Sequence, residues 1–410
     1  MQNALFFKNK CIFFNSFVYL CFFNSPIFQL MTFHSKLPDV GTSIFTVMSA
    51  LAQQHEAVNL SQGFPNFDCD DALKDLVHQY MSKGFNQYAP MAGVPTLRAR
   101  LADKIKILYG KSISAENEIT ITAGGTQALF TAIAAFVRPH DEVIIIEPAY
   151  DSYAPSIQSV GGKVIPYRMS PPNYRIDWKH FQSLITPKTR MIILNTPHNP
   201  TGMTFKDADF QALIHCVKNT NILILSDEVY EHLVYDGAKH LSIMDYPALW
   251  MRGLAVFSFG KTFHATGWKM GYCVAPEGLM REFRKLHQFN VFSVNAPIQY
   301  ALADFLENEA NYMHLNTFYQ QKRDFFAKKM QKTAFKPLNC AGTYFQLYDY
   351  GHLSDESDVD FTRRLTIDYG VAAIPVSAFC TGGSNERVIR FCFAKTEAVL
   401  EKACQLLEKI

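Results

Sequence analysis

The sequence predicts an α/β protein with a mostly parallel sheet and a smaller α+β domain at its C-terminal end. The first observation is a series of short, strand-like runs that alternate with helical stretches, as a mostly parallel sheet requires. These runs lie at residues 142–146, 163–167, 191–194, 222–226 and 255–258. The second is that the run 222–225 is continuously apolar, which is typical of a parallel strand buried on both faces. The third is size: 410 residues exceed one typical domain, and a hydrophobic content of 48% is enough for a sizeable core.

The chain divides into four predicted parts. They are a Phe-rich N-terminal extension at residues 1–31, an arm with the first helix at 32–60, a large domain at 61–295 and a small C-terminal domain at 296–410. Apolar and aromatic residues spread over 305–330 predict long helices that link the two domains.

The N-terminal extension has an unusual composition. Eight phenylalanines between Phe6 and Phe28 accompany only two charged residues, Lys8 and Lys10. A secretory signal or membrane anchor is one hypothesis. Against it, Asn, Ser and Pro interrupt the apolar run, and a spanning helix needs about 20 mostly apolar residues. We favour a second hypothesis, in which Met31 is the true start and the preceding stretch is a mis-assigned extension that is no part of the mature protein; disorder is the third.

Composition argues against several classes of protein. A net charge of +2, from 39 basic and 37 acidic residues, gives no electrostatic case for nucleic acid, and no membrane partner is expected. Nine cysteines without a C-x-x-C pair favour reduced thiols and a cytoplasmic location over a disulfide framework. Thirteen histidines lack the spacing of metal ligands, so no metal site is expected.

The most informative stretch runs from Ser258 to Gly271 and places Lys261 in a turn rich in Ser, Gly and Thr. An apolar run at 254–257 precedes it, and small residues let the backbone approach another group closely. A lysine held in this way can lose its proton and form an imine with an aldehyde, which is how pyridoxal phosphate is tethered. Lys269, eight residues later, would then meet a phosphate. An ordinary strand-to-loop junction is the alternative interpretation.

Asp227 ends the apolar run that begins at Ile222. The carboxyl end of a buried parallel strand delivers such a side chain to a crevice, and a buried carboxylate is unfavourable unless it meets a cation. A protonated pyridine nitrogen is such a cation, and Asp227 would keep it protonated. Tyr230, three residues later, could donate to a phenolic oxygen of the same ring. The alternative is a strand that ends in a helix-capping aspartate.

Two further turns follow strand-like runs. In the first, two prolines and a glycine around Asn199 define a turn in which the amide could face a phenolate oxygen. In the second, Gly124 and Gly125 lead into a helix, where backbone N–H groups and the Thr126 hydroxyl could bind phosphate. Each turn alone is also compatible with a purely structural role.

Together, and in this order, the four motifs resemble the fold type I, class I and II aminotransferases that use pyridoxal phosphate. The likeness covers about residues 36–410. Five other stretches resemble the branch of methionine and kynurenine aminotransferases, and within it the bacterial methionine aminotransferases. These stretches are residues 59–67, 86–93, 151–155, 292–295 and 390–395. The resemblance implies that the large domain, 61–295, binds the cofactor.

The resemblance also implies a role for each matching residue. Lys261 is similar to the family's Schiff-base lysine and Asp227 to the partner of the pyridine nitrogen; with Tyr230 they are the predicted catalytic residues. Asn199 and Tyr230 match residues that hold the phenolic oxygen, and Tyr150 matches the aromatic residue stacked on the ring. The positions that match phosphate-binding residues are Gly125, Thr126, Ser258, Lys269 and, across the interface of a homodimer, Tyr88.

The substrate site is predicted around Arg390. This residue alternates with apolar neighbours in a strand-like run, so it faces opposite to them. A planar guanidinium suits bidentate binding of a carboxylate, and the resemblance assigns it the substrate's α-carboxylate. An arginine at the surface of an edge strand is the alternative. The other predicted substrate-binding residues are Gly63, Asn199, Phe45, Phe64 and Phe292.

The predicted function is transfer of the amino group of methionine or an aromatic amino acid to a 2-oxo acid. Phe45, Phe64, Tyr88 and Phe292 resemble the family's pocket wall, which offers no arginine for a second carboxylate. Ser293 departs from the histidine of kynurenine aminotransferases, which puts kynurenine in question. Two alternatives remain: β-elimination at a cysteine S-conjugate, and a non-enzymatic regulator, which the four intact motifs disfavour.

Overall fold

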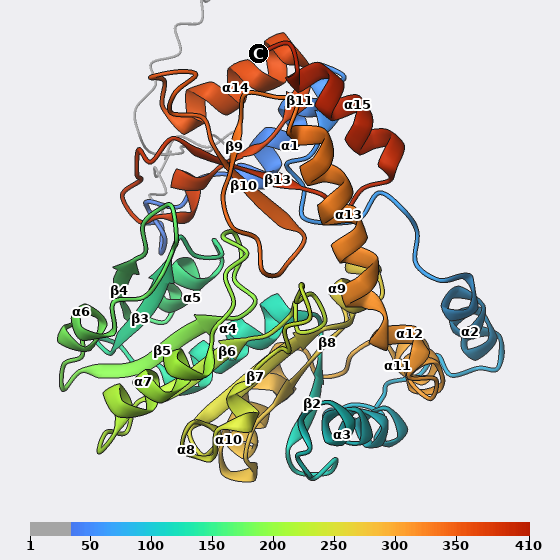
Figure 1. The fold of residues 1–410 in the computed structure, drawn as a ribbon. Helices are drawn as coiled ribbons and strands as arrows, with labels where there is room; N and C mark the ends of the chain where they lie inside the picture. Colours follow the sequence, from blue (N-terminus) through green and yellow to red (C-terminus); the bar gives the residue numbers. More distant parts are fainter. Residues whose placement is uncertain (1–33) are drawn as a thin grey trace, which may run out of the picture. The chain divides into compact units, whose positions relative to one another are not determined.

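The computed structural model describes residues 34–410 (Figure 1). The chain separates into two compact units, residues 1–41 and 42–410. The described part of the first unit, 34–41, contains only bends and turns. The hypotheses on the Phe-rich extension lie outside the described residues. Within residues 34–410, no helix combines the length and apolar character needed to cross a membrane.

A seven-stranded sheet forms the centre of the second unit (Figure 1). Its strand order is β2-β8-β7-β6-β5-β3-β4, and β8 alone runs antiparallel to its neighbours. The strands are β2 Ile119–Thr122, β3 Glu142–Glu147, β4 Lys163–Arg168, β5 Thr189–Asn195, β6 Leu223–Asp227, β7 Gly253–Ser258 and β8 Gly271–Val274. The predicted mostly parallel α/β fold is confirmed. The antiparallel strand β8 was not predicted.

Both faces of the sheet are covered, and β3 shows the alternation that this requires. Val143 and Ile145 pack with the apolar cluster under α4, whereas Ile144 and Ile146 belong to the cluster on the opposite face. Successive side chains of a strand point to opposite faces, so an unbroken apolar run serves two cores. The helices associated with this sheet are α3 Pro95–Tyr109, α4 Gly125–Phe136, α5 Tyr153–Ser159, α6 Trp178–Ser183, α7 Asp207–Val217, α8 Pro247–Trp250 and α10 Glu277–Asn290.

A second, four-stranded antiparallel sheet is formed by the C-terminal part of the chain, in the order β12-β13-β10-β9. Its strands are β9 Lys336–Pro337, β10 Phe345–Asp349, β12 Ile374–Pro375 and β13 Val388–Cys392. The helices of this region are α13 Leu315–Met330, α14 Asp358–Tyr369 and α15 Glu397–Leu407. The expected α+β content at the C-terminal end is thus observed.

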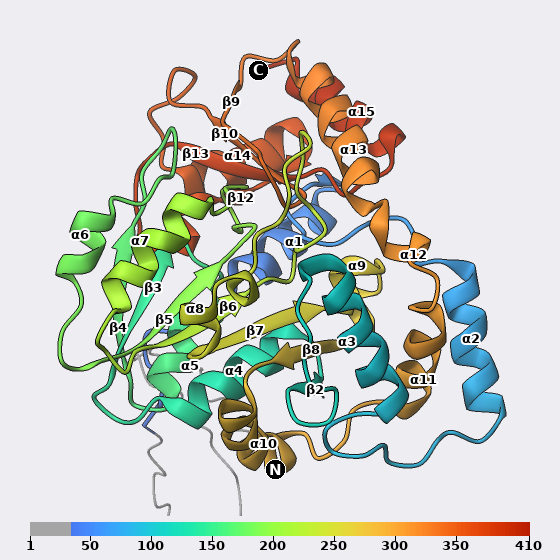
Figure 2. The ribbon, with the colours of Figure 1, turned by 60° about the horizontal axis from the view of Figure 1, so that its bottom comes forward.

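The arm and the C-terminal region are interleaved. Helix α1, Ile44–Gln54, packs against α14, and strand β1, Val58–Asn59, pairs in parallel with β11, Val371–Ala372. Helix α11, Ala296–Phe305, packs against α2, Asp71–Ser82, and against α3 (Figure 2). The remaining helical elements are α9 Phe259–Thr262, α12 Ala310–Met313, η1 Ile243–Asp245, η2 Thr266–Trp268 and η3 Val376–Phe379. The division at residues 60 and 295 stays a prediction.

Behind the parallel sheet, a buried ion pair joins α3 to the turn that follows β6. Lys104 Nζ contacts Glu231 and lies 3.0 Å from the Tyr272 hydroxyl, and Tyr109 donates to Glu231 at 2.6 Å. Burial alone would raise the pKa of Glu231, but the Lys104 charge and the hydrogen bonds from Lys104 and Tyr109 together outweigh it and lower that pKa to about 2. Glu231 is therefore ionised, and its buried charge depends on the contact with Lys104.

We expect Lys104→Met to lower the free energy of unfolding by about 3–5 kcal/mol, because it leaves the Glu231 carboxylate buried without its cation. Replacing both partners, as Lys104→Met with Glu231→Leu, should cost less than the single change, since no lone charge remains. Equilibrium urea unfolding followed by tryptophan fluorescence measures both. The matched control is Lys285→Met in the exposed pair with Glu282, where we expect a change of about 0–1 kcal/mol. Equal losses for the buried and exposed pairs would contradict this assignment.

Candidate active site

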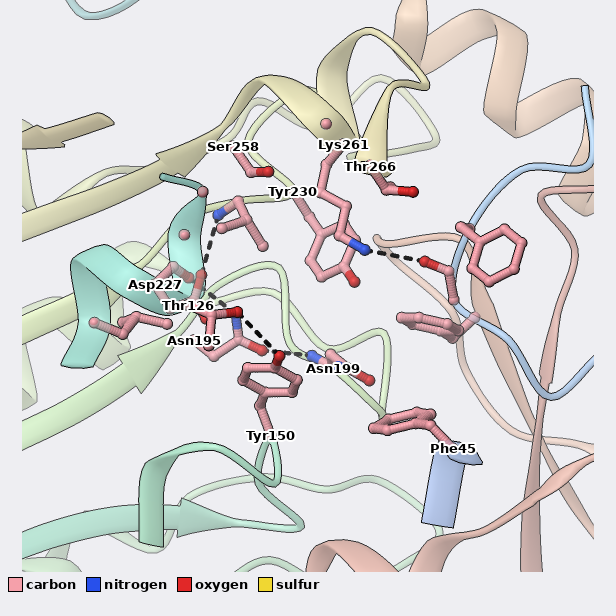
Figure 3. A pocket seen from close by; sticks show the side chains of 18 of the residues that line it. Phe45, Thr126, Tyr150, Asn195, Asn199, Asp227, Tyr230, Ser258, Lys261 and Thr266 are labelled. Carbon is pink, nitrogen blue, oxygen red and sulfur yellow. Dashed lines mark hydrogen bonds between the residues drawn. The ribbon is translucent and has the colours of Figure 1, made fainter. Parts of the chain in front are cut away.

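A cavity of about 400 Å³ opens at the carboxyl ends of β5, β6 and β7 (Figure 3). This is the edge of an open α/β sheet at which ligands characteristically bind. Most of the predicted site residues line it. The lining includes Phe45, Gly63, Phe64, Gly125, Thr126, Tyr150, Asn199, Asp227, Tyr230, Ser258, Lys261, Lys269 and Arg390.

Asp227 is the last residue of β6 and is almost fully buried, at 4% exposure. Its carboxylate accepts hydrogen bonds from the Tyr153 hydroxyl at 2.6 Å and from the backbone N–H of Val229 at 3.3 Å. Burial raises its pKa to about 6, although these donors and Lys261 oppose the rise. The carboxylate is therefore mostly ionised at neutral pH, while both hydrogen bonds come from uncharged donors.

The turn after β5 connects Asp227 to the opposite side of the cavity. The Asn195 amide donates to the backbone carbonyl of Asp227 at 2.9 Å and accepts from the backbone N–H of Asn199 at 2.6 Å. The side-chain oxygen of Asn199 accepts from Arg390 at 2.7 Å. Because that oxygen is occupied, the Asn199 NH₂ group is left to donate to another acceptor.

Lys261 lies in the short helix α9, directly after β7. Its amine donates to the Gly63 carbonyl at 3.0 Å and to the Tyr344 hydroxyl at 2.8 Å. Burial lowers the pKa of this amine to about 8. A Cβ at the neighbouring Gly260 would lie 2.9 Å from the Cα of Thr266, so the turn requires glycine there.

An anion-binding corner lies at the start of α4. Gly124 has φ +84°, a backbone conformation that favours glycine, and it precedes the free N–H groups of the first helical turn. A Cβ at Gly124 would lie 3.6 Å from Lys269 Nζ, which shows how closely that amine approaches. Lys269 itself is left-handed, with φ +55°. Thr126 contributes a hydroxyl 3.2 Å from the Tyr150 hydroxyl.

Arg390 is completely buried on β13, in register with Leu347 of β10. Besides its contact with Asn199, it donates to the Ser61 carbonyl at 3.0 Å, and its guanidinium lies 3.8 Å from the ring centroid of Phe345. Burial lowers its pKa to about 10, so it stays charged at neutral pH. Nε is buried and has no hydrogen-bond partner among residues 34–410. Each Nη also keeps a second N–H beyond its bond to Asn199 or Ser61, and a guanidinium with such donors at a cavity can bind a carboxylate.

Two predicted residues lie outside this cavity. Tyr88 is 81% exposed and Phe292 is 59% exposed, and their rings pack against each other with centroids 5.0 Å apart. Their predicted roles remain predictions, since the one for Tyr88 requires a second subunit.

Sequence reasoning missed several residues that complete the site. Tyr153 hydrogen-bonds Asp227, Asn195 orients Asn199, Tyr344 contacts Lys261, and Phe345 stacks on Arg390. Asn195 and Tyr153 lie within stretches that already pointed to the family, so their positions beside Asn199 and Tyr150 could have indicated them. Tyr344 and Phe345 belong to an aromatic segment that carries no recognisable motif.

Comparison with known proteins identifies the family. The model described as "Aminotransferase class I and II" matches residues 55–407. The chain belongs to the class I and II aminotransferases, which depend on pyridoxal phosphate. The predicted family, enzyme class and cofactor are thereby confirmed.

Two relatives and one solved structure show where the chain lies within that family. It is 49% identical to methionine aminotransferase of Escherichia coli K12, over 94% of this chain and 100% of that one. It is 33% identical to human kynurenine–oxoglutarate transaminase 1, over 88% of this chain and 93% of the relative. The crystal structure of YbdL from E. coli, reported with a methionine aminotransferase function, superposes with a TM-score of 0.91 at 48% identity, covering 93% and 100% of the two chains.

The cavity fits pyridoxal phosphate on its own chemistry. The start of α4 and Lys269 provide donors for a phosphate, while the ionised Asp227 is buried without a cationic hydrogen-bond partner. Lys261 is a buried amine of lowered pKa, as attachment to an aldehyde requires. These groups, together with Tyr150, Asn199, Tyr230 and Ser258, would hold the cofactor.

We expect borohydride reduction in the presence of pyridoxal phosphate to fix the cofactor to Lys261. This amine lines the cavity, and burial lowers its pKa to about 8. Lys261→Ala should give no covalent product. Lys269→Met, the matched control, should still be labelled at Lys261 but should bind the cofactor about 10–100-fold more weakly, since one charged hydrogen bond to phosphate is lost. Mass spectrometry of the reduced peptides locates the label; a label on another lysine in Lys261→Ala would contradict the assignment.

Proposed function

We propose that the protein transfers the amino group of methionine, or of an aromatic amino acid, to a 2-oxo acid. The observation that carries the proposal is the composition of the substrate side of the cavity. One buried guanidinium, that of Arg390, lines the cavity together with the aromatic side chains of Phe45, Phe64 and Phe345. The name of the 49% identical relative supports the same amino donor.

Pyridoxal phosphate, when bound, supplies an aldehyde that takes up the amino group and a pyridine ring that withdraws electrons from the substrate's Cα. Lys261 accepts the proton from Cα, because a pKa of about 8 leaves part of its population neutral near pH 7. The Asp227 carboxylate would face the pyridine nitrogen and favour its protonated form. Arg390 and the Gly63 amide bind the α-carboxylate and so orient the Cα–H bond.

Selectivity follows from charge. An amino donor with a second carboxylate would carry an unpaired negative charge among Phe45, Phe64 and Phe345, and such burial costs several kcal/mol. A thioether gains sulfur–aromatic contacts of about 0.3–1.5 kcal/mol in the same place. The Ser293 hydroxyl donates to the Ala89 carbonyl at 2.9 Å, so its proton is already used in a hydrogen bond within the chain.

A panel of amino donors with one fixed 2-oxo acid tests this proposal. We expect kcat/KM to be highest for methionine, followed by phenylalanine, tyrosine and kynurenine, with aspartate lower by about 10²-fold or more because of its uncompensated charge. Aspartate in first place would show that the substrate pocket is misassigned. With a cysteine S-conjugate, formation of pyruvate and ammonia in place of the aminated cofactor would favour the β-lyase alternative.

The proposal includes a homodimer with shared sites and a cytoplasmic location. Tyr88, Phe292 and the 86% exposed Phe289 present aromatic surface that a second copy of the chain could cover. The cysteines within residues 34–410 are all unpaired, which is compatible with a reducing compartment.

Subunit mixing tests the shared site. Tyr88→Phe and Lys261→Ala homodimers should each be impaired, whereas random exchange of subunits should restore about a quarter of the intact sites, because half of the dimers are mixed and each has one complete site. Activity per active-site equivalent before and after exchange is the measurement. A fully active monomer in analytical ultracentrifugation would exclude the arrangement.

A further inference from the structure

The Lys261 amine, the Tyr344 hydroxyl and the Gly63 carbonyl form a closed group of three polar atoms. Lys261 Nζ lies 2.8 Å from Tyr344 Oη and 3.0 Å from the Gly63 carbonyl oxygen. Tyr344 Oη lies 2.6 Å from the same carbonyl oxygen. Each atom therefore contacts the other two.

The direction of each hydrogen bond in this group is determined by its chemistry. A carbonyl oxygen only accepts, so the phenolic proton of Tyr344 points to Gly63. Burial raises the pKa of Tyr344 well above its ordinary value, so that proton is retained. The hydroxyl oxygen must then accept from Lys261. A neutral amine has two N–H bonds and one lone pair; with both N–H bonds directed to Tyr344 and Gly63, the lone pair faces neither of them.

Tyr344 cannot easily leave this position. Its side chain is fully buried among other aromatic rings, with centroids 5.2 Å from Tyr230, 5.6 Å from Tyr319 and 4.9 Å from Phe345. Close packing of this kind confines a side chain to one rotamer.

The Gly63 carbonyl is held as firmly by the residues on either side of it. Lys395 is buried and donates to the Phe64 carbonyl at 2.7 Å and to the Gln62 carbonyl at 3.4 Å. Arg390 donates to the Ser61 carbonyl, two residues before Gly63. Both acceptors for the Lys261 amine are thus parts of a fixed frame.

We propose that Tyr344 is a positioning residue that, with the Gly63 carbonyl, holds the neutral Lys261 amine so that its lone pair is available to accept the proton from the substrate's Cα. The inference rests on the proposed aminotransferase chemistry but not on the identity of the amino donor. Without Tyr344 the amine keeps one fixed acceptor and rotates about it, so the lone pair spends less time in the productive direction.

The chain offers a matched pair of variants for the test. Tyr344→Phe removes the hydroxyl that contacts Lys261, while Tyr319→Phe removes a neighbouring buried hydroxyl that has no hydrogen-bond partner among residues 34–410. In the cofactor-free protein, the rate at which an amine-reactive reagent labels Lys261 is followed against pH by peptide mass spectrometry. In the holoenzyme, kcat and the deuterium isotope effect are measured with a Cα-deuterated amino donor.

We expect Tyr344→Phe to lower the apparent pKa of Lys261 by about 0.5–1, because an acceptor that favours the ammonium form is lost. We expect kcat to fall about 10-fold with a larger isotope effect and a nearly unchanged KM, since proton transfer alone is slowed. Tyr319→Phe should match the unmodified protein in all of these. Identical labelling and isotope effects in the two variants would overturn the proposal. If no amino donor were turned over, the proposed function would fail, while the labelling experiment would still report on Tyr344.

Discussion

The burial of the Asp227 carboxylate is the constraint on which the site depends. A carboxylate with a pKa raised to about 6 by burial would be a liability if it did not meet a cationic ring. The chain holds it with uncharged donors only, and through its backbone carbonyl it also anchors Asn195. From there, hydrogen bonds run through Asn199 to Arg390. The group that would face the cofactor's nitrogen and the group that would face the substrate's carboxylate are therefore fixed relative to each other.

A second frame is built on the backbone of residues 61–64. Four consecutive carbonyl oxygens accept hydrogen bonds from side chains. Two of the donors, Arg390 and Lys395, are cationic, and the other two are the Lys261 amine and the Tyr344 hydroxyl. Carbonyl dipoles supply part of the stabilisation that buried cations lose on leaving water. The segment follows β1, which pairs with β11. This pairing holds residues 61–64 next to the C-terminal region at the point where they line the cavity.

How much of the site could be predicted depends on where each residue lies relative to a strand. Asp227, Asn199 and Lys261 each follow an apolar run, and the carboxyl ends of neighbouring parallel strands meet at one edge, so local sequence predicts their convergence. Tyr344 is 83 residues from Lys261 in sequence, and the contact joins residues that lie next to strands of two different sheets, Tyr344 before β10 and Lys261 after β7. Strand β8 was missed because its four residues are too few to show a clear apolar alternation. It also starts at the last residue of the polar, glycine-containing motif that begins at Ser258.

Arg390 also explains why discrimination among amino donors should rest on charge rather than on fit. Its Nη atoms already bind Asn199 and Ser61, which fixes the plane of the guanidinium against the Phe345 ring and leaves Nε as the buried donor without a partner. A single substrate carboxylate would meet the remaining N–H groups of this guanidinium, and the aromatic walls offer no second cation for another one. Neutral side chains then compete through the apolar area they bury, at roughly 25 cal/mol per Å². Differences among methionine, phenylalanine and tyrosine should consequently be graded, whereas the step to an acidic donor should be abrupt.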